Sequence, residues 1–200
     1  MSFRIEQKYR INKYKLPNLY EWISKNNGKK IYLDRKVSSI YFDNYELACY
    51  HDSLEGVTPR KKNRLRWYGD INNKFKNSNL EKKINSIEGR FKKTKKLTNP
   101  INILKLGILD NQYGLCSPVL QVEYNREYFK IFNIRITVDT KIRYKKFKRK
   151  NSFSPYYLED NVVLEAKTLN PFTQNHVNRN INFEKIRFSK YCRAVEKIYR

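Results

Sequence analysis

The stretch Arg64-Leu65-Arg66-Trp67-Tyr68-Gly69 sets the pattern for this 200-residue chain, because charged and apolar residues alternate along it. Side chains two residues apart on an extended strand point to the same face. Arg64 and Arg66 are therefore predicted on one face of a strand, and Leu65 and Trp67 on the other. Two neighbouring guanidinium groups offer paired N–H donors, which suit the oxygens of a phosphate group.

The same alternation recurs along the chain. In the first segment Phe3, Ile5, Tyr9 and Ile11 share one parity, and the other parity is charged. Charges at i and i+2 or i+4 recur in Glu6-Gln7-Lys8-Tyr9, Glu81-Lys82-Lys83, Arg135-Ile136-Thr137-Val138-Asp139 and Glu165-Ala166-Lys167. One such strand most often indicates a sheet with one face in water. If helices cover the apolar faces of all of them, the charged faces look inward, and a closed sheet with a basic lumen would hold a polyanion.

The composition favours a single domain over residues 1–200 with a polyanionic partner. Hydrophobic residues make up 40% of the chain, and the net charge is +24 with a pI near 9.9. Nucleic acid, an anionic membrane and inorganic phosphate chains all match this charge. The charge therefore selects a class of partner and not one ligand.

The cysteines and the hydropathy indicate a soluble, cytoplasmic protein. Cys49, Cys116 and Cys192 form no C-x-x-C pair, which argues against a disulfide framework and against a zinc cluster. No apolar run approaches the ~20 residues of a membrane-spanning helix, and no signal-peptide pattern opens the sequence.

The fold class predicted from the periodicity is α+β, an eight-stranded antiparallel barrel with a few flanking helices. Helical spacing is seen from Leu16 to Ile23, from Ile101 to Leu109 and from Ser189 to Arg200. The charged run Lys141 to Asn151 is interpreted as a solvated loop or hairpin tip, with docking to a membrane or polyanion as the alternative. Strands are predicted near 3–11, 37–42, 62–69, 79–86, 90–96, 119–129, 133–141 and 161–168.

Eight ordered motifs together resemble the polyphosphate polymerase domain of the vacuolar transporter chaperone (VTC) family, one of the triphosphate tunnel metalloenzymes. The resemblance runs from Phe3 to about Tyr191. The motifs are Glu6-x-Lys8-Tyr9, Tyr41-Phe42-Asp43-Asn44, Arg64-Leu65-Arg66-Trp67-Tyr68-Gly69, Glu81-x-Lys83, Tyr124-Asn125-Arg126, Arg135-Ile136-Thr137-Val138-Asp139-Thr140, Leu164-Glu165-Ala166-Lys167 and Phe188-Ser189-Lys190-Tyr191.

The resemblance implies an enzyme that passes the terminal phosphoryl group of ATP to a growing polyphosphate chain inside a basic tunnel, with Mn²⁺ or Mg²⁺. Phosphoryl transfer requires positioning and charge neutralisation more than a protein nucleophile. The phosphate ligands implied are Lys8, Arg64, Arg66, Lys83, Arg126, Arg135 and Lys190. Further phosphate-binding candidates are Arg60, Lys92, Tyr124, Lys167 and Ser189. Glu165 is implied as the metal ligand, with Glu6 as a second candidate.

Plain alternatives accompany these assignments. The basic residues could be salt-bridge partners of Glu6, Glu81 or Glu165. The family usually shows Lys-x-Arg after the Glu-x-Lys pair, whereas this chain has Lys92-Lys93-Thr94-Lys95, in which Lys92 is the match.

Two other functions remain open. Enzymes of the related CYTH group hydrolyse triphosphates and resemble each other in an N-terminal Glu-x-Glu-x-Lys, but Arg4 occupies the first glutamate position here. An arginine in place of this glutamate replaces a metal ligand with a cation, which favours a polymerase-like site. A noncatalytic polyanion or RNA binder is the third reading, although Trp67 and the strand tyrosines lie mostly on the apolar parity, which makes nucleic acid a poor candidate. The enzyme would work alone or through a separate membrane protein, at the cytoplasmic face of that membrane.

Overall fold

The computed structural model describes residues 5–69, 77–149, 153–168 and 183–200. The chain forms two compact units. Unit 1 consists of Met1–Arg35, Tyr124–Ile142 and Leu158–Phe188, and unit 2 of Lys36–Glu123, Arg143–Tyr157 and Ser189–Arg200. Phe3 and Arg4 lie outside the described residues.

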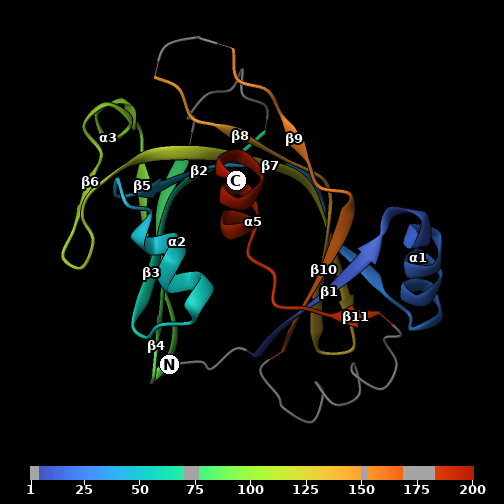
Figure 1. The fold of residues 1–200 in the computed structure, drawn as a ribbon. Coiled ribbons are helices and arrows are strands. Elements are labelled where there is room, and N and C mark those ends of the chain that lie inside the picture. The colour runs from blue at the N-terminus through green and yellow to red at the C-terminus, as the bar shows by residue number, and fades with distance from the viewer. Residues whose placement is uncertain (1–4, 70–76, 150–152, 169–182) are drawn as a thin grey trace. The chain divides into compact units, whose positions relative to one another are not determined.

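The described strands form a mostly antiparallel sheet with a few helices, so the predicted α+β class is confirmed (Figure 1). The strand order is β11-β1-β10-β8-β7-β2-β3-β4-β5, with β6 on β7 and β9 on β8. The strands are β1 Ile5–Asn12, β2 Lys29–Asp43, β3 Arg60–Tyr68, β4 Ser78–Ser86, β5 Gly89–Leu97, β6 Ile108–Asp110, β7 Gly114–Ile131, β8 Ile134–Lys146, β9 Tyr157–Leu158, β10 Asn161–Thr168 and β11 Glu184–Lys185.

The structure differs from the sequence prediction in four details. Eleven strands are described instead of eight, and among the described residues no pairing joins the end strands β11 and β5. The predicted helix from Ile101 to Leu109 is α3, Ile101–Leu106, which ends at Gly107, where φ is positive (85°), before β6 begins. The predicted loop from Lys141 belongs to β8 as far as Lys146, since Ile142 and Tyr144 are buried on its apolar face.

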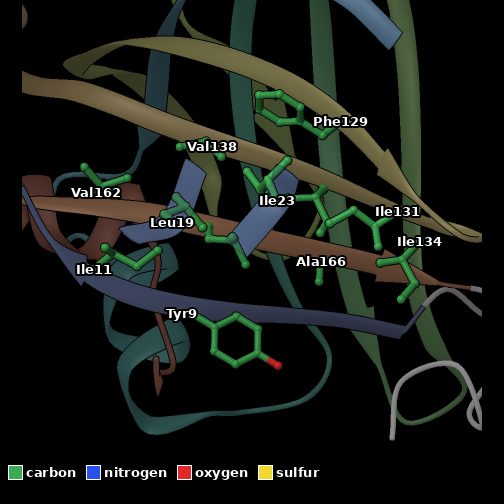
Figure 2. Close-up of a cluster of buried hydrophobic side chains, with 12 residues drawn as sticks. Tyr9, Ile11, Leu19, Ile23, Phe129, Ile131, Ile134, Val138, Val162 and Ala166 are labelled. Atoms are coloured by element: carbon green, nitrogen blue, oxygen red, sulfur yellow. The ribbon is translucent and has the colours of Figure 1, made fainter. Parts of the chain in front are cut away.

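The core of unit 1 lies between the sheet and one amphipathic helix, α1 (Leu16–Lys25), which follows a short 3₁₀ turn, Lys13–Lys15. Leu19 and Ile23 of α1 pack with the apolar faces of β1, β7, β8 and β10 (Figure 2). The strand residues of this cluster are Tyr9, Ile11, Phe129, Ile131, Ile134, Ile136, Val138, Val162, Leu164 and Ala166. The alternation predicted from the sequence is therefore confirmed here, and it leaves the charged residues of β1, β8 and β10 on the other face.

The chain leaves α1 through a tight turn that requires glycine. Asn27 takes a left-handed conformation with φ 55°. A Cβ atom on Gly28 would lie 2.4 Å from Cγ2 of Ile23 and 2.8 Å from its carbonyl oxygen. Any larger residue would push β2 away from the helix that covers the core.

Unit 2 is built on β2, β3, β4 and β5, with Leu65 and Trp67 buried as predicted. Helix α5, Lys190–Tyr199, buries Tyr191, Cys192, Ala194 and Val195. Helix α2, Ala48–Glu55, was not predicted. Its apolar residues have a weak helical period, and backbone hydrogen bonds to a buried carboxylate, described below, hold its first turn.

None of the helices in the described residues is long and apolar enough to span a lipid bilayer.

Candidate functional site

The cations of β3 form a row on one face of unit 2. Cross-strand register places Arg64 between Tyr41 of β2 and Glu81 of β4, and places Arg66 beside Ser39 of β2. Nε and Nη2 of Arg64 lie 2.7 and 2.6 Å from Oε2 of Glu81, and Nη1 donates to the Tyr41 hydroxyl at 3.1 Å. Nη1 of Arg66 lies 3.7 Å from the same Glu81 oxygen. Both predicted arginines thus belong to one site around a buried glutamate.

Lysines of β4 and β5 complete this arginine cluster, which we define as Arg64, Arg66, Glu81, Lys83 and Lys92. Lys83 pairs in register with Lys92 of β5. Nζ of Lys92 lies 3.0 Å from Oε1 of Glu81, so the two glutamate oxygens contact different partners.

The register of β5 also decides which of its lysines share the face of the cluster. Lys96 has the parity of Lys92, whereas Lys93 and Lys95 pair with Lys82 and Leu80 on the opposite face. Lys92, the match chosen from the sequence, thus lies on the same face of the sheet as Arg64.

Glu81 is charged at neutral pH. Burial acts to raise the pKa of Glu81, but the charges of Arg64 and Arg66, together with Lys92, lower it to about 2. The same two arginines lower the pKa of the buried Tyr41 phenol against the effect of its burial. The cluster therefore keeps an excess of positive charge over one carboxylate.

Asp43 joins the two helices of unit 2 that flank the cluster. It is fully buried and accepts backbone N–H bonds from Asn44, Cys49 and Tyr50 at 2.8, 2.9 and 3.1 Å, which hold the start of α2. The Tyr191 hydroxyl also donates to Asp43, and the Tyr191 ring stacks on Tyr41 with centroids 5.0 Å apart.

The start of α5 carries two predicted residues, Ser189 and Lys190. Ser189 is the N-cap, and its Oγ accepts from the Cys192 amide at 3.3 Å and from Nζ of Lys62 at 2.9 Å. Lys190 is half-buried at the first position of α5. The sequence interpretation missed Lys62, although its parity with Arg60, Arg64 and Arg66 could have identified it.

Arg60 is held by the backbone. Its Nη1 donates to the carbonyl oxygens of Gly56 and Val57 at 2.9 and 2.8 Å. This contact fixes the end of α2, so the structure gives Arg60 a structural role beside its predicted one.

A second charged site, the carboxylate cluster, lies in unit 1 and consists of Glu6, Lys8, Arg126, Glu165 and Lys167. On neighbouring strands β1 and β10, Lys8 stands opposite Glu165 and Glu6 stands opposite Lys167. Nζ of Lys167 lies 2.5 Å from Glu165 and 3.6 Å from Glu6, while Nζ of Lys8 lies 3.3 Å from Glu6. Lys8 also donates to the Phe188 carbonyl at 2.8 Å.

Glu165 is a buried carboxylate that stays charged. Burial would raise the pKa of Glu165, but Lys167, Lys8 and Arg126 hold it well below the ordinary value, so the group stays ionised. Glu165 and Glu6 both reach one ammonium group, that of Lys167, so their oxygens already converge on a single positive charge. Mg²⁺ and Mn²⁺ prefer one or two carboxylates combined with substrate phosphates, and this pair fits that requirement. No group of three or more metal-ligating side chains occurs among the described residues.

Arg126 is fixed by a bidentate pair with Asp139, at 2.6 and 2.7 Å, and its Nη2 lies 3.7 Å from Glu165. Its guanidinium stands over the Tyr124 ring, 5.1 Å from the centroid. Burial acts against the charge of Arg126, but Asp139 and the other anions raise its pKa well above the ordinary value. Asp139 thus orients this arginine, and the sequence interpretation gave Asp139 no role.

Arg135 of β8 stands opposite Lys167 on β10. Its Nε is buried and makes no hydrogen bond within the part of the chain that the structure describes. An unpaired donor of this kind is costly to bury, and a phosphate oxygen would satisfy it.

Comparison with known proteins supports this reading of the fold. The family model of the VTC domain matches residues 3–113 and 105–199. A putative adenylate cyclase from Vibrio parahaemolyticus superposes with a TM-score of 0.58 at 11% identity, covering 98% of both chains. A putative adenylyl cyclase from Hippeastrum, described as having a dominant triphosphatase activity, gives a TM-score of 0.57 at 12% identity and covers 98% of this chain and 96% of its own.

A third similar structure is the Mediator head module of Schizosaccharomyces pombe, with a TM-score of 0.51 at 11% identity over 88% of this chain and 90% of that one. No curated protein sequence matches this chain. At these identities the structural likeness establishes the fold alone. The family match covers nearly the whole sequence and agrees with the order of its charged motifs, so this chain belongs to the VTC domain family.

Proposed function

We propose that this protein is a polyphosphate polymerase, which transfers the terminal phosphoryl group of ATP to the end of an inorganic polyphosphate chain. The observation that carries the proposal is the register of the arginine cluster, in which Arg64, Arg66, Lys83 and Lys92 occupy one face of β3, β4 and β5. Membership of the VTC domain family supports the same reading.

Each of the two clusters, taken by itself, offers groups that bind phosphate. Arg64 and Arg66 provide forked N–H donors for the equatorial oxygens of the transferred phosphoryl group. In unit 2, Lys83 and Lys190 add point charges. In unit 1, taken by itself, Arg126 and Arg135 offer forked donors and Lys8 offers a point charge. During transfer a new P–O bond forms at the chain end, the bond from the γ-phosphorus to its bridging oxygen breaks, and ADP leaves.

Glu165, assisted by Glu6, would hold the divalent cation, Mn²⁺ or Mg²⁺. When bound, that ion neutralises charge on the phosphate oxygens. The lowered pKa of Glu165 keeps this carboxylate deprotonated, as a metal ligand must be.

A triphosphate hydrolase of the CYTH type is the second candidate. It is favoured by the likeness to the Hippeastrum protein with triphosphatase activity. Water would then attack in place of the phosphate chain, and free phosphate would be released. A noncatalytic polyanion binder is the third candidate, and the burial of Trp67 speaks against base stacking on β3.

One assay separates these functions. The pure protein is incubated with ATP and Mn²⁺ or Mg²⁺, and ADP, free phosphate and acid-stable polymer are measured. Polymer that an exopolyphosphatase degrades, formed together with ADP, supports the polymerase. Free phosphate without polymer supports the hydrolase, and no turnover with either metal contradicts both for the protein acting alone. Addition of a membrane fraction then tests the requirement for a membrane partner.

A further inference from the structure

Glu81 occupies the donors that a phosphate group would use. Oε2 accepts from Arg64 and lies near Arg66, and Oε1 contacts Lys92. At least three of the five N–H donors of Arg64 are engaged, two by Glu81 and one by Tyr41. The glutamate side chain is 6% exposed, so water replaces few of these contacts.

A carboxylate and a phosphate group are the same kind of partner for a guanidinium. Both accept two parallel N–H bonds with a negative charge, and such charge-assisted bonds are the stronger ones in proteins. A phosphate group can therefore reach the Nε and Nη2 donors of Arg64 only by replacing Glu81, and the exchange costs the free energy of the existing pair.

We propose that Glu81 is an internal competitor for the phosphate site, which lowers the affinity of the arginine cluster for every anion that uses Arg64 and Arg66. This inference rests on the proposed function, because it concerns the same site. The consequence is a minimum affinity that an anion must have in order to bind at a given concentration. A common loss of affinity excludes weak ligands such as orthophosphate at concentrations at which a triphosphate, held by several cations at once, still binds.

The contacts of Glu81 also allow the exchange to be reversible. Its two oxygens have different partners, so the contact of Oε2 with the arginines can be lost while Oε1 keeps Lys92. Lys92 is about half exposed, with a side-chain exposure of 53%, and can move with the glutamate. The displaced carboxylate then keeps a positive partner, which limits the cost of exchange.

The test is calorimetry of tripolyphosphate and of orthophosphate binding in EDTA, with wild type and Glu81→Gln. Removing the charge of the competitor should tighten the binding of both anions by at least about tenfold, the usual weight of a charge-assisted pair. Orthophosphate should therefore bind the variant at concentrations that leave wild type unoccupied.

Asp110→Asn is the matched control for net charge. Asp110 of β6 is also buried and also pairs with two cations, Lys61 at 3.0 Å and Lys82 at 2.6 Å. These two lysines lie on β3 and β4, on the face opposite to Arg64 and Glu81. Both substitutions raise the net charge by one, so long-range attraction changes equally. Anion affinity should stay at the wild-type value in Asp110→Asn.

The outcomes separate this inference from the proposed function. If wild type binds tripolyphosphate and Glu81→Gln binds it no more tightly, the inference is wrong and the function stands. If neither protein binds tripolyphosphate, both are wrong. Glu81→Asp, which keeps the charge on a shorter side chain, provides a second variant should Glu81→Gln fail to fold. Glu81→Asp should bind tripolyphosphate more tightly than wild type does, because its carboxylate lies farther from the arginines. An unchanged affinity for tripolyphosphate would overturn the inference.

Discussion

Arg64 shows how one side chain can serve both the fold and the proposed chemistry. Its guanidinium neutralises the buried Glu81 and bonds to Tyr41, while its strand parity puts it on the face that carries the other cations. A salt bridge and a phosphate ligand are therefore not exclusive readings of this residue. The salt bridge fixes the orientation of the guanidinium, and in the proposed reaction an anion would take the place of the carboxylate.

Arg64→Ala and Arg66→Ala should each lower turnover by roughly ten to a hundred and fifty fold, the equivalent of ~1.5 to 3 kcal/mol for a charge-assisted contact. Turnover at saturating ATP measures the effect. Arg10→Ala is the control, because Arg10 is exposed and pairs with the exposed Glu184 of β11. Full activity of both cluster variants would contradict a phosphate-binding role for β3.

Glu165→Gln should make turnover nearly undetectable and weaken the response to added metal, because the amide keeps the shape of the side chain and loses the charge. Triphosphate binding without metal should survive or increase, since a negative charge is removed from a basic site. A metal titration of activity beside calorimetry measures the two effects separately. Glu21→Gln, on the exposed face of α1, is the control. An unchanged metal requirement would leave Glu165 as a salt-bridge partner only.

The elements act through register. Consecutive lysines of β5 point to opposite faces of the sheet, so they have different neighbours. Lys92 contacts Glu81, whereas Lys93 stands opposite Lys82 on the other face. Both are exposed and carry the same charge, so they form a matched pair for experiment.

Lys92→Ala should alter the affinity for tripolyphosphate severalfold, and Lys93→Ala should leave it unchanged. The direction for Lys92→Ala is a loss, because a cation is removed from the face that binds the anion. Calorimetry at two salt concentrations checks the result. Equal effects of the two substitutions would indicate that only the overall charge matters, and the register would then carry no function.

Helix α2 depends on a tertiary contact, and Asp43 supplies it. Asp43→Ala would leave three backbone N–H groups and the Tyr191 hydroxyl without their acceptor, at a cost of about 1 to 3 kcal/mol for each buried group that stays unpaired. The melting temperature should fall by several degrees at least. Asp34→Ala is the control, because Asp34 pairs with Lys30 on the surface of β2 and such pairs contribute little. A variant as stable as wild type would contradict the anchoring role of Asp43.

At the scale of the whole molecule, the buried carboxylates make stability depend on pH. Cations depress the pKa of Glu81, Asp110 and Glu165 in the folded state. A depressed pKa means that the unfolded chain takes up protons first as the pH falls. The stabilisation is therefore complete above about pH 4.5, the unperturbed value for Glu81, and is lost as the pH falls toward about 2.

Urea unfolding followed from pH 7 to pH 2 should show a steep loss of stability between about pH 4.5 and 2. Glu81→Gln should lose less stability over this range, because it lacks one of the carboxylates whose pKa is lowered by folding. Equal pH profiles for the variant and wild type would contradict the depressed pKa of Glu81. The strong net positive charge adds to the loss in both proteins and so does not affect the comparison.

The sequence predicted the strands well because alternation is a local property. A period of two residues identifies β3 and the two-sided character of β1, β8 and β10 without reference to the rest of the chain. It also predicted α1, whose apolar residues recur at helical spacing. The same local rule failed for β8, where a run of charges resembles a loop unless Ile142 and Tyr144 are seen to alternate through it.

Strand β7 shows a limit of this rule. Its buried residues change parity, from Leu120 and Val122 to Phe129 and Ile131. Alternation counted from the first pair would place Arg126 in the apolar core, whereas it forms a bidentate pair with Asp139 on the charged face. The resemblance to the family, and not the period, singled out Arg126, which lies beside Asp139 and Glu165 in the structure.

The sequence by itself determined the class of the fold, the excess of cations and the strands that carry them, because charge and period are written in consecutive residues. Tertiary structure alone decided which charges meet. Glu81 lies between Arg64, Arg66 and Lys92, and the fixing of Arg126 by Asp139 follows from the pairing of strands. These contacts join residues distant in the chain, and their strength depends on burial. Neither distance nor burial can be obtained from spacing along the sequence.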